Sequence, residues 1–195
     1  MAEIGFGEKI KGFLISPVET FQKVENEDLG PVLKYYVILV VIFSILNAII
    51  MGTMLSAMTS MIPIKMPLMG AAGGGLAAVT MFIGYLILLI VGLFIGAAII
   101  HIFVILLGGK KGYAQTTKAL AYGMTPQLLL GWIPFIGIIA GIWALIVEIL
   151  GIRELQEMST GKAVLAVILP VIIIGIIAGI AILLAGPKVP SYPTP

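Results

Sequence analysis

The side chains that could do acid–base or metal chemistry are few in this chain and widely separated. A single histidine, His101, cannot build a metal centre with two histidine ligands, and the only aspartate, Asp28, precedes the first long apolar run. Glu148 stands near the end of another apolar stretch, and no Gly-x-Ser-x-Gly string marks a serine nucleophile. The sequence therefore indicates no catalytic constellation, and we expect a non-enzymatic protein without a cofactor.

His101 and Glu148 both lie close to the point where we expect an apolar helix to reach the cytosol. Snorkelling towards water, or local pairing of Glu148 with Arg153 or Lys118, explains such shallow positions. A proton relay is the alternative. Both residues are therefore candidate polar sites within the membrane.

Gln127 and Asn47 are expected to lie deeper, and Tyr122 precedes Gln127 in the same apolar stretch. Polar side chains in hydrocarbon usually form hydrogen bonds between helices. The alternative is a polar pathway, for which Pro126 would supply a kink beside Gln127. Gln127 and Tyr122 join the candidate polar sites.

Methionines are concentrated where the first apolar helix ends. Met51, Met54, Met58 and Met61 fall at helical spacing on one face. Flexible thioethers commonly fill gaps in packing, and that is the interpretation we favour. Binding of Cu(I), whose softness suits sulfur, is the weaker alternative.

Charge is confined to three short segments of the chain. All of the acidic residues and all of the basic ones except Lys65 and Lys188 lie in residues 1–34, 108–118 and 148–162. A charge held in hydrocarbon costs roughly 2.5 to 3.5 kcal/mol or more. This segregation is typical of an integral membrane protein in contact with membrane lipids.

Composition supports the same class. The chain is 61% hydrophobic and 10% charged, against about 25% charged in a typical soluble domain. Its net charge of +2 arises from interleaved acids and bases, so we expect no nucleic-acid partner. The absence of cysteine excludes disulfides and thiolate metal sites.

Apolar runs predict the number of membrane crossings. A crossing needs about 20 apolar residues, and residues 35–53, 76–107 and 163–185 each supply one. Residues 119–147 are uncharged but contain Gly131-Trp132-Ile133-Pro134, a turn that suits the start of a new helix. Extended to Ala114 and Leu150, this stretch gives two further spans of about 18 residues, roughly 27 Å each.

The fold class predicted is therefore all-α, a polytopic bundle of five transmembrane helices. With five crossings, all three charged segments lie on one side, as the positive-inside rule requires. Four crossings would place 108–118 and 151–162 on opposite sides. We expect the amino terminus inside and the carboxyl terminus outside.

The chain divides into three expected regions. Residues 1–31 form a cytosolic segment, residues 32–185 the five-helix domain, and residues 186–195 a proline-rich external tail. In the first region, Ser16 is expected to cap a helix with Pro17 at its first position and Glu19 completing a capping box. Its mixed apolar and lysine composition predicts a short amphipathic helix at the headgroup level. We expect Gly30-Pro31 to break regular structure before the first span.

Glycines four residues apart present smooth helix faces on which a second backbone can pack. We expect this helix-packing role, within the bundle or in a homo-oligomer, for three pairs: Gly92 and Gly96, Gly137 and Gly141, and Gly175 and Gly179.

Several short strings recur in an order that resembles the Yip1 family of five-span membrane proteins. They are the element around Ser16-Pro17, Asp28-Leu29-Gly30-Pro31, Gly112-Tyr113, Ala121-Tyr122 with Pro126, and Ile133-Pro134. The resemblance covers roughly residues 8–183. Eukaryotic members display Asp-Leu-Tyr-Gly-Pro, and this chain lacks the tyrosine, so it is similar to a compact prokaryotic member.

The resemblance implies a membrane-organising or partner-scaffolding role. Better-understood relatives are associated with small GTPases, vesicle budding and membrane shaping, whereas the prokaryotic role is undefined. We expect Asp28, Leu29, Gly30 and Pro31 to contact a cytosolic or membrane protein partner. The alternative is a small oligomeric transporter or channel for an ion or small solute.

Overall fold

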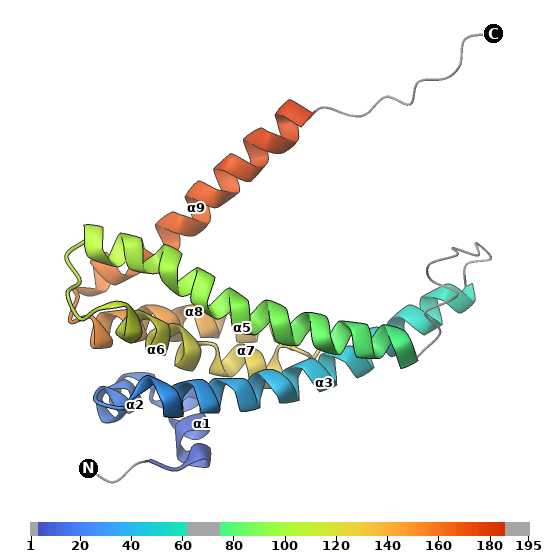
Figure 1. Ribbon diagram of the computed structural model, residues 1–195, viewed down its shortest axis with the longest axis horizontal. Coiled ribbons are helices and arrows are strands. Elements are labelled where there is room, and N and C mark those ends of the chain that lie inside the picture. The colour runs from blue at the N-terminus through green and yellow to red at the C-terminus, as the bar shows by residue number, and fades with distance from the viewer. Residues whose placement is uncertain (1–3, 62–74, 186–195) are drawn as a thin grey trace.

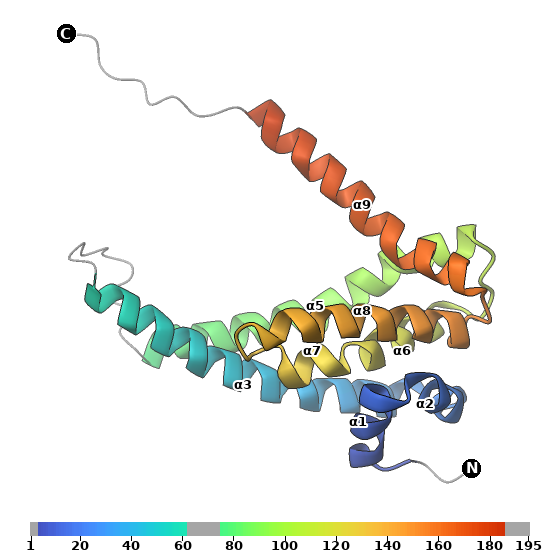
Figure 2. The same cartoon turned by 180° about the vertical axis from the view of Figure 1, so that it is seen from behind.

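The computed structural model describes residues 4–61 and 75–185, and every regular element in these ranges is a helix. Two short helices, α1 (Phe6–Ile15) and α2 (Pro17–Val24), precede the long helix α3 (Leu29–Met61). Then follow α5 (Gly75–Leu106), α6 (Tyr113–Gly123), α7 (Thr125–Leu130), α8 (Ile136–Leu155) and α9 (Thr160–Ala185). Figures 1 and 2 show α3, α5 and α8 running alongside one another, with α1 and α2 at one end.

Within residues 4–61 and 75–185, four helices are long and apolar enough to cross a membrane. Their apolar segments are Leu29–Met54, Ala78–Leu106, Ile136–Leu155 and Thr160–Leu184. The all-helical class and the long apolar helices confirm the coarse prediction from the sequence.

The segment expected to form the third crossing is divided into two short helices. The break falls at Met124, between the 11 residues of α6 and the 6 residues of α7. Pro126 stands in the first turn of α7, where its missing N–H group costs little. α6 and α7 follow each other along α8 in both views (Figures 1 and 2). Neither is long enough alone to cross a membrane.

Three predicted helix starts differ in detail from the structure. Pro17 does occupy the first turn of α2, but the Ser16 side chain makes no capping hydrogen bond. Gly30 and Pro31 do not interrupt structure, because α3 already begins at Leu29 and a proline is tolerated in a first turn. α8 begins at Ile136, two residues beyond Pro134, after Phe135 with a φ of 66°.

The amino-terminal region was expected at the headgroup level, but its apolar face is used inside the protein. Phe13 and Phe21 have 0% exposure and Val24 has 2%. The two phenyl rings, one from α1 and one from α2, lie 4.8 Å apart between centroids. Because these side chains are already covered, the helices pack against the bundle and do not offer that face to lipid.

Two glycines outside the predicted pairs allow α6 and α8 to pack closely. A Cβ atom on Gly123 would lie 2.9 Å from the Cα atom of Glu148 in α8. A Cβ atom on Gly151 would lie 2.6 Å from the Phe21 ring and 3.1 Å from the Cα atom of Ala119. These distances are too short for any larger residue, so Gly123 and Gly151 set the spacing between α6, α8 and α2.

α9 leaves the bundle towards its carboxyl end (Figure 1). Only 11% of the most apolar 18-residue stretch within Thr160–Leu184 is buried, and large side chains from Val171 to Leu184 are exposed. A lipid environment is the natural cover for such a surface.

The close approach at Gly123 gives a test of the packing. Gly123→Ala places a methyl group against the backbone of α8, which cannot rotate away, and we expect a loss of about 1 to 3 kcal/mol in the free energy of unfolding. Gly84→Ala is the matched control in α5, because a Cβ atom there meets nothing within 4 Å. Thermal unfolding of purified protein in micelles measures both. Equal melting temperatures for the two variants would contradict the packing described here.

Candidate partner-binding site

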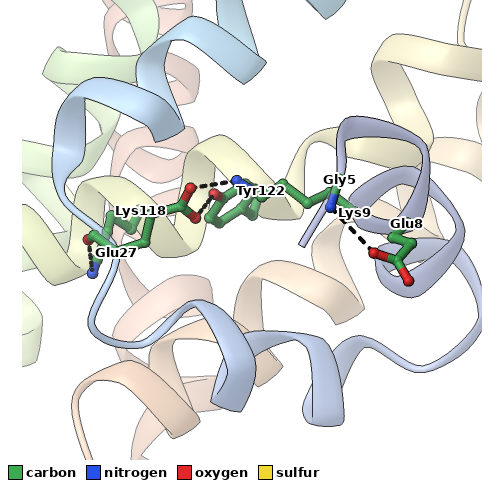
Figure 3. Close-up of polar contacts among 6 residues, drawn as sticks. All are labelled: Gly5, Glu8, Lys9, Glu27, Lys118 and Tyr122. Atoms are coloured by element: carbon green, nitrogen blue, oxygen red, sulfur yellow. Dashed lines mark hydrogen bonds and ion pairs between the residues drawn. The ribbon is translucent and has the colours of Figure 1, made fainter. Parts of the chain in front are cut away.

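Glu27 connects three segments that are distant in the sequence. Its carboxylate forms an ion pair with the ammonium group of Lys9 in α1 and accepts a hydrogen bond from the Tyr122 hydroxyl in α6 (Figure 3). The side chains of Lys9 and Glu27 are only 8% and 11% exposed, and Tyr122 is fully buried. A partly buried carboxylate therefore has both a counter-charge and a hydrogen-bond donor, which is the arrangement that burial of charge requires.

Lys118 fastens the loop between α2 and α3 to α6. Its ammonium group donates to the carbonyl oxygens of Glu25, at 2.7 Å, and of Glu27, at 2.8 Å. The Gln115 amide donates to the Glu25 carbonyl at 3.3 Å. Lys118 is 3% exposed, so these bonds are shielded from water. The acidic segment 25–28 is consequently held in one conformation against α6.

A cluster of aromatic rings packs against the Tyr122 side of this polar network. Tyr122 stacks on Phe13 with 4.5 Å between ring centroids and lies 5.2 Å from Tyr35. The Tyr35 hydroxyl is 3.0 Å from the Thr125 hydroxyl, and the Lys9 ammonium lies 5.6 Å from the Tyr122 ring centroid. Packed aromatic pairs contribute about 0.5 to 1.5 kcal/mol beyond area burial. The cluster thus gives the polar network a rigid base.

An open cavity of about 300 Å³ lies between the 25–28 loop and α6. Its lining consists of Glu25, Asn26, Glu27, Asp28, Leu29, Ala114, Gln115 and Lys118. The Gln115 Oε1 atom is buried and has no hydrogen-bond partner among the described residues. Neither the Glu25 nor the Asp28 carboxylate forms an ion pair within residues 4–61 and 75–185. The cavity therefore offers acceptors and negative charge to a ligand that brings donors.

The predicted string Asp28-Leu29-Gly30-Pro31 borders this cavity. Asp28, Gly30 and Pro31 are exposed, and Leu29 is half-buried and lines the cavity. A Cβ atom on Gly30 would meet nothing within 4 Å. All four residues are therefore within reach of a partner that approaches this end of the molecule.

The loop between α5 and α6 is fastened in a similar way. The Gln156 amide donates to the carbonyl oxygen of Gly112, at 2.8 Å, and to the Thr116 hydroxyl, at 3.0 Å. Its side-chain oxygen accepts from the Lys111 backbone N–H at 3.0 Å. The hydrogen bond from Lys111 to the Glu157 carboxylate raises the pKa of the exposed Lys111 ammonium group. Gln156, with 2% exposure, thus fixes the turn between α5 and α6.

The predicted polar sites within the apolar helices do not converge on one centre. His101 Nδ1 lies 2.8 Å from the Thr116 hydroxyl, and Tyr122 belongs to the Glu27 network. Gln127 has a buried Oε1 atom without a partner in the described part of the chain, and it lies beside Gly131 and Gly141. Glu148 lies at the α6–α8 contact.

The expected pairing of Glu148 with Arg153 or Lys118 is wrong. Arg153 pairs with its neighbour Glu154, and Lys118 donates to the backbone of the acidic loop. Both cations are thus engaged by other groups, Arg153 by a side chain and Lys118 by backbone carbonyl oxygens. Glu148 lies at the α6–α8 crossing, where neither cation pairs with it.

The glycine pairs have different surroundings. Cβ atoms on Gly137 and Gly141 would meet Gly131 and Gln127, and one on Gly96 would lie 3.8 Å from Leu120. Around Gly92, Gly175 and Gly179 there is nothing within 4 Å. A packing role for these three stays a prediction.

Two of the four methionines at the end of the first apolar helix have side chains that the structure describes. Met54 is exposed and Met51 half-buried. The side chains of Met58 and Met61 lie outside the described residues.

Lys9, Glu27 and Gln156 were not singled out from the sequence. Each stands among other charged or polar residues in a segment that reads as solvated, and no local spacing distinguishes it. The sequence did contain one indication of this network. Lys118 and Tyr122 lie one helical turn apart on α6, and a lysine and a tyrosine on one helix face beside an apolar span indicate a nearby carboxylate.

The chain belongs to the Yip1 domain family, whose sequence model matches residues 11–182. With its long apolar helices, it is a multi-pass integral membrane protein. No curated protein and no solved structure matches the chain.

The buried pair between Lys9 and Glu27 gives a test of the site's rigidity. Lys9→Met leaves the Glu27 carboxylate without its counter-charge, and we expect a loss of about 3 kcal/mol in the free energy of unfolding. Lys11→Met, an exposed change on the same helix, should cost less than about 0.5 kcal/mol. Denaturant unfolding in micelles measures both variants. A loss in Lys9→Met no larger than in Lys11→Met would show that the pair contributes nothing.

Proposed function

We propose that this protein is a non-enzymatic membrane scaffold that binds a partner protein at its cytosolic end. The observation that carries the proposal is the acid-lined cavity beside the exposed string 28–31, held rigid by Lys118 and the Glu27 network. Membership of the Yip1 domain family is consistent with this role.

The chemistry of the cavity favours a basic segment of the partner. Glu25 and Asp28 carry unpaired carboxylates, and Gln115 adds a buried acceptor. A lysine or arginine side chain would supply both the charge and the donors that these groups lack. Exposed charges of this kind govern partner choice and association rate more than affinity. Because the loop is already ordered by bonds from α6, little conformational entropy is lost when a partner binds.

For the membrane topology we propose five crossings, with the amino terminus inside and the carboxyl terminus outside. The combined segment 113–130 follows the whole length of α8. Near one end Gln156 binds Gly112, and at the other a Cβ atom on Gly137 would lie 2.6 Å from the Gly131 carbonyl oxygen. α8 is one of the four helices able to cross, and the 18 residues of the broken segment extend roughly 27 Å. The broken segment therefore crosses beside α8.

The side reached by the carboxyl terminus distinguishes five crossings from four. With five, a carboxyl-terminal tag is digested by protease added outside intact cells, while an amino-terminal tag on the same protein is protected. With four, both tags are protected. Immunodetection of the two tags before and after protease treatment measures this. Protection of the carboxyl-terminal tag would overturn the five-span proposal.

Partner recruitment is tested with charge reversal at the cavity. Full-length protein in liposomes should retain a cytosolic partner, and Asp28→Lys should weaken retention about tenfold by repelling a basic segment. Glu19→Lys is the matched control, since Glu19 is exposed on α2 away from the cavity and the change in net charge is the same. Co-sedimentation of cytosolic proteins measures retention. Equal retention by both variants, or no retained protein with wild type, would contradict the proposal.

A transporter or channel is the second candidate, and one observation favours it. Ser44 Oγ, Asn47 Oδ1 and Gln127 Oε1 are buried without partners within the described ranges. The first two lie on α3 and the third on α7, helices that contact each other. Buried polar atoms in a membrane bundle can line a solute pathway. Ion or solute flux that disappears in Gln127→Leu would favour this function over the scaffold.

A further inference from the structure

A second cavity lies among the membrane helices, separate from the cytosolic one. Its volume is about 190 Å³, and it lies between α3, α5, α6 and α8. Seven of its eight lining residues are Tyr36, Leu88, Leu89, Gly92, Leu93, Leu120 and Met124. The eighth is Glu148, which places a single carboxyl group among walls that are apolar except for the Tyr36 hydroxyl.

Glu148 has no partner in this cavity. None of the ion pairs or side-chain hydrogen bonds in the parts of the chain that the structure describes involves the Glu148 carboxylate. The other polar lining group, the Tyr36 hydroxyl, donates to the Leu89 carbonyl oxygen at 2.9 Å and so has no hydrogen left for Glu148. A lone carboxylate within a membrane bundle is costly and marks a functional site by default.

The cavity opens sideways through α5. Leu88 is 65% exposed, and Gly92 is exposed one turn further along the same helix. A Cβ atom on Gly92 would meet nothing within 4 Å, so the absence of a side chain leaves the mouth of the cavity clear. Both residues lie within Ala78–Leu106, a segment able to cross the membrane. The opening therefore faces the hydrocarbon and not the cytosol.

We propose that this cavity binds an amphiphile with a primary ammonium group, which enters from the lipid and pairs with the Glu148 carboxylate. The ammonium group supplies the counter-charge that Glu148 lacks. Its hydrocarbon chain leaves past Leu88 and Gly92 into the bilayer.

The size of the cavity fits the end of such a molecule and excludes a whole lipid. A volume of 190 Å³ accommodates roughly six water-sized groups at about 30 Å³ each. This is enough for the ammonium group and the first few carbons. The apolar walls formed by Leu89, Leu93 and Leu120 exclude water from the pair, which strengthens its attraction.

Two sources share this chemistry, an aminophospholipid headgroup and a free long-chain amine. Native mass spectrometry of the full-length protein separates them. In one arm the protein is released from vesicles of equal phosphatidylethanolamine and phosphatidylcholine with matched acyl chains. In the other it is titrated with dodecylamine or dodecanol in micelles.

The proposal expects a preference for the primary amine in at least one arm. Retention of phosphatidylethanolamine over phosphatidylcholine identifies the lipid as the source. Retention of dodecylamine over dodecanol without a lipid preference identifies the free amine. Glu148→Gln should reduce the preference about tenfold, because it removes a charge-assisted contact and keeps the side-chain shape. Equal retention of amine and non-amine probes by the wild type would overturn the proposal.

Two further variants separate binding from folding. Gly92→Leu leaves the carboxylate in place and fills the mouth of the cavity, so it should also reduce amine retention. Glu157→Gln removes an exposed carboxylate beyond the end of α8 and should leave retention unchanged. A preference that survives Gly92→Leu, or that falls equally in Glu157→Gln, would contradict binding in this cavity.

Discussion

The end of the helix bundle that carries α1 and α2 depends on neutralising and hydrogen-bonding one carboxylate, that of Glu27. A carboxyl group buried beside a membrane is stable only with a counter-charge and hydrogen-bond donors, and Lys9 and Tyr122 provide them from α1 and α6. The same contact brings Phe13 onto the Tyr122 ring and places the 25–28 loop where Lys118 reaches its carbonyl oxygens. The amino-terminal helices, the acidic loop and the broken helix thus form one unit.

The sequence predicted the class of protein well because lipid imposes a strong and simple rule. Charges stay out of hydrocarbon, so the gaps between charged segments indicated α3, α5 and α9. Within the uncharged stretch 119–147, the turn at 131–134 was needed to separate α8 from the segment before it. The sequence predicted less well what covers the apolar face of the amino-terminal helices. The apolar residues of this region, Phe13 and Phe21 among them, predicted an amphipathic helix at the headgroup level, because sequence does not reveal whether lipid or protein covers an apolar face. The structure covers them with Tyr122 and Gly151.

Contacts between residues far apart in the chain could not be predicted from local sequence patterns either. The pairing of Glu148 was predicted from nearby cations, yet Arg153 pairs with Glu154 and Lys118 donates to the backbone of the 25–28 loop. Likewise, glycines four apart were expected to mark packing faces, whereas the close approach of α6 and α8 uses Gly123 and Gly151, which stand on different helices. Spacing within one helix cannot show which residue of another helix lies opposite. The two cavities follow from such contacts, one acidic and beside the 25–28 loop, the other mainly apolar and between α3, α5, α6 and α8.

The central claim is that Glu27 holds α1, the 25–28 loop and α6 together as one unit. Hydrogen–deuterium exchange of the full-length protein in nanodiscs, compared between wild type and Glu27→Ala, tests it most directly. The account predicts faster exchange throughout α1 (Phe6–Ile15) as well as in the loop, with exchange in α9 unchanged. Faster exchange confined to the residues next to position 27, with α1 still protected, would contradict it.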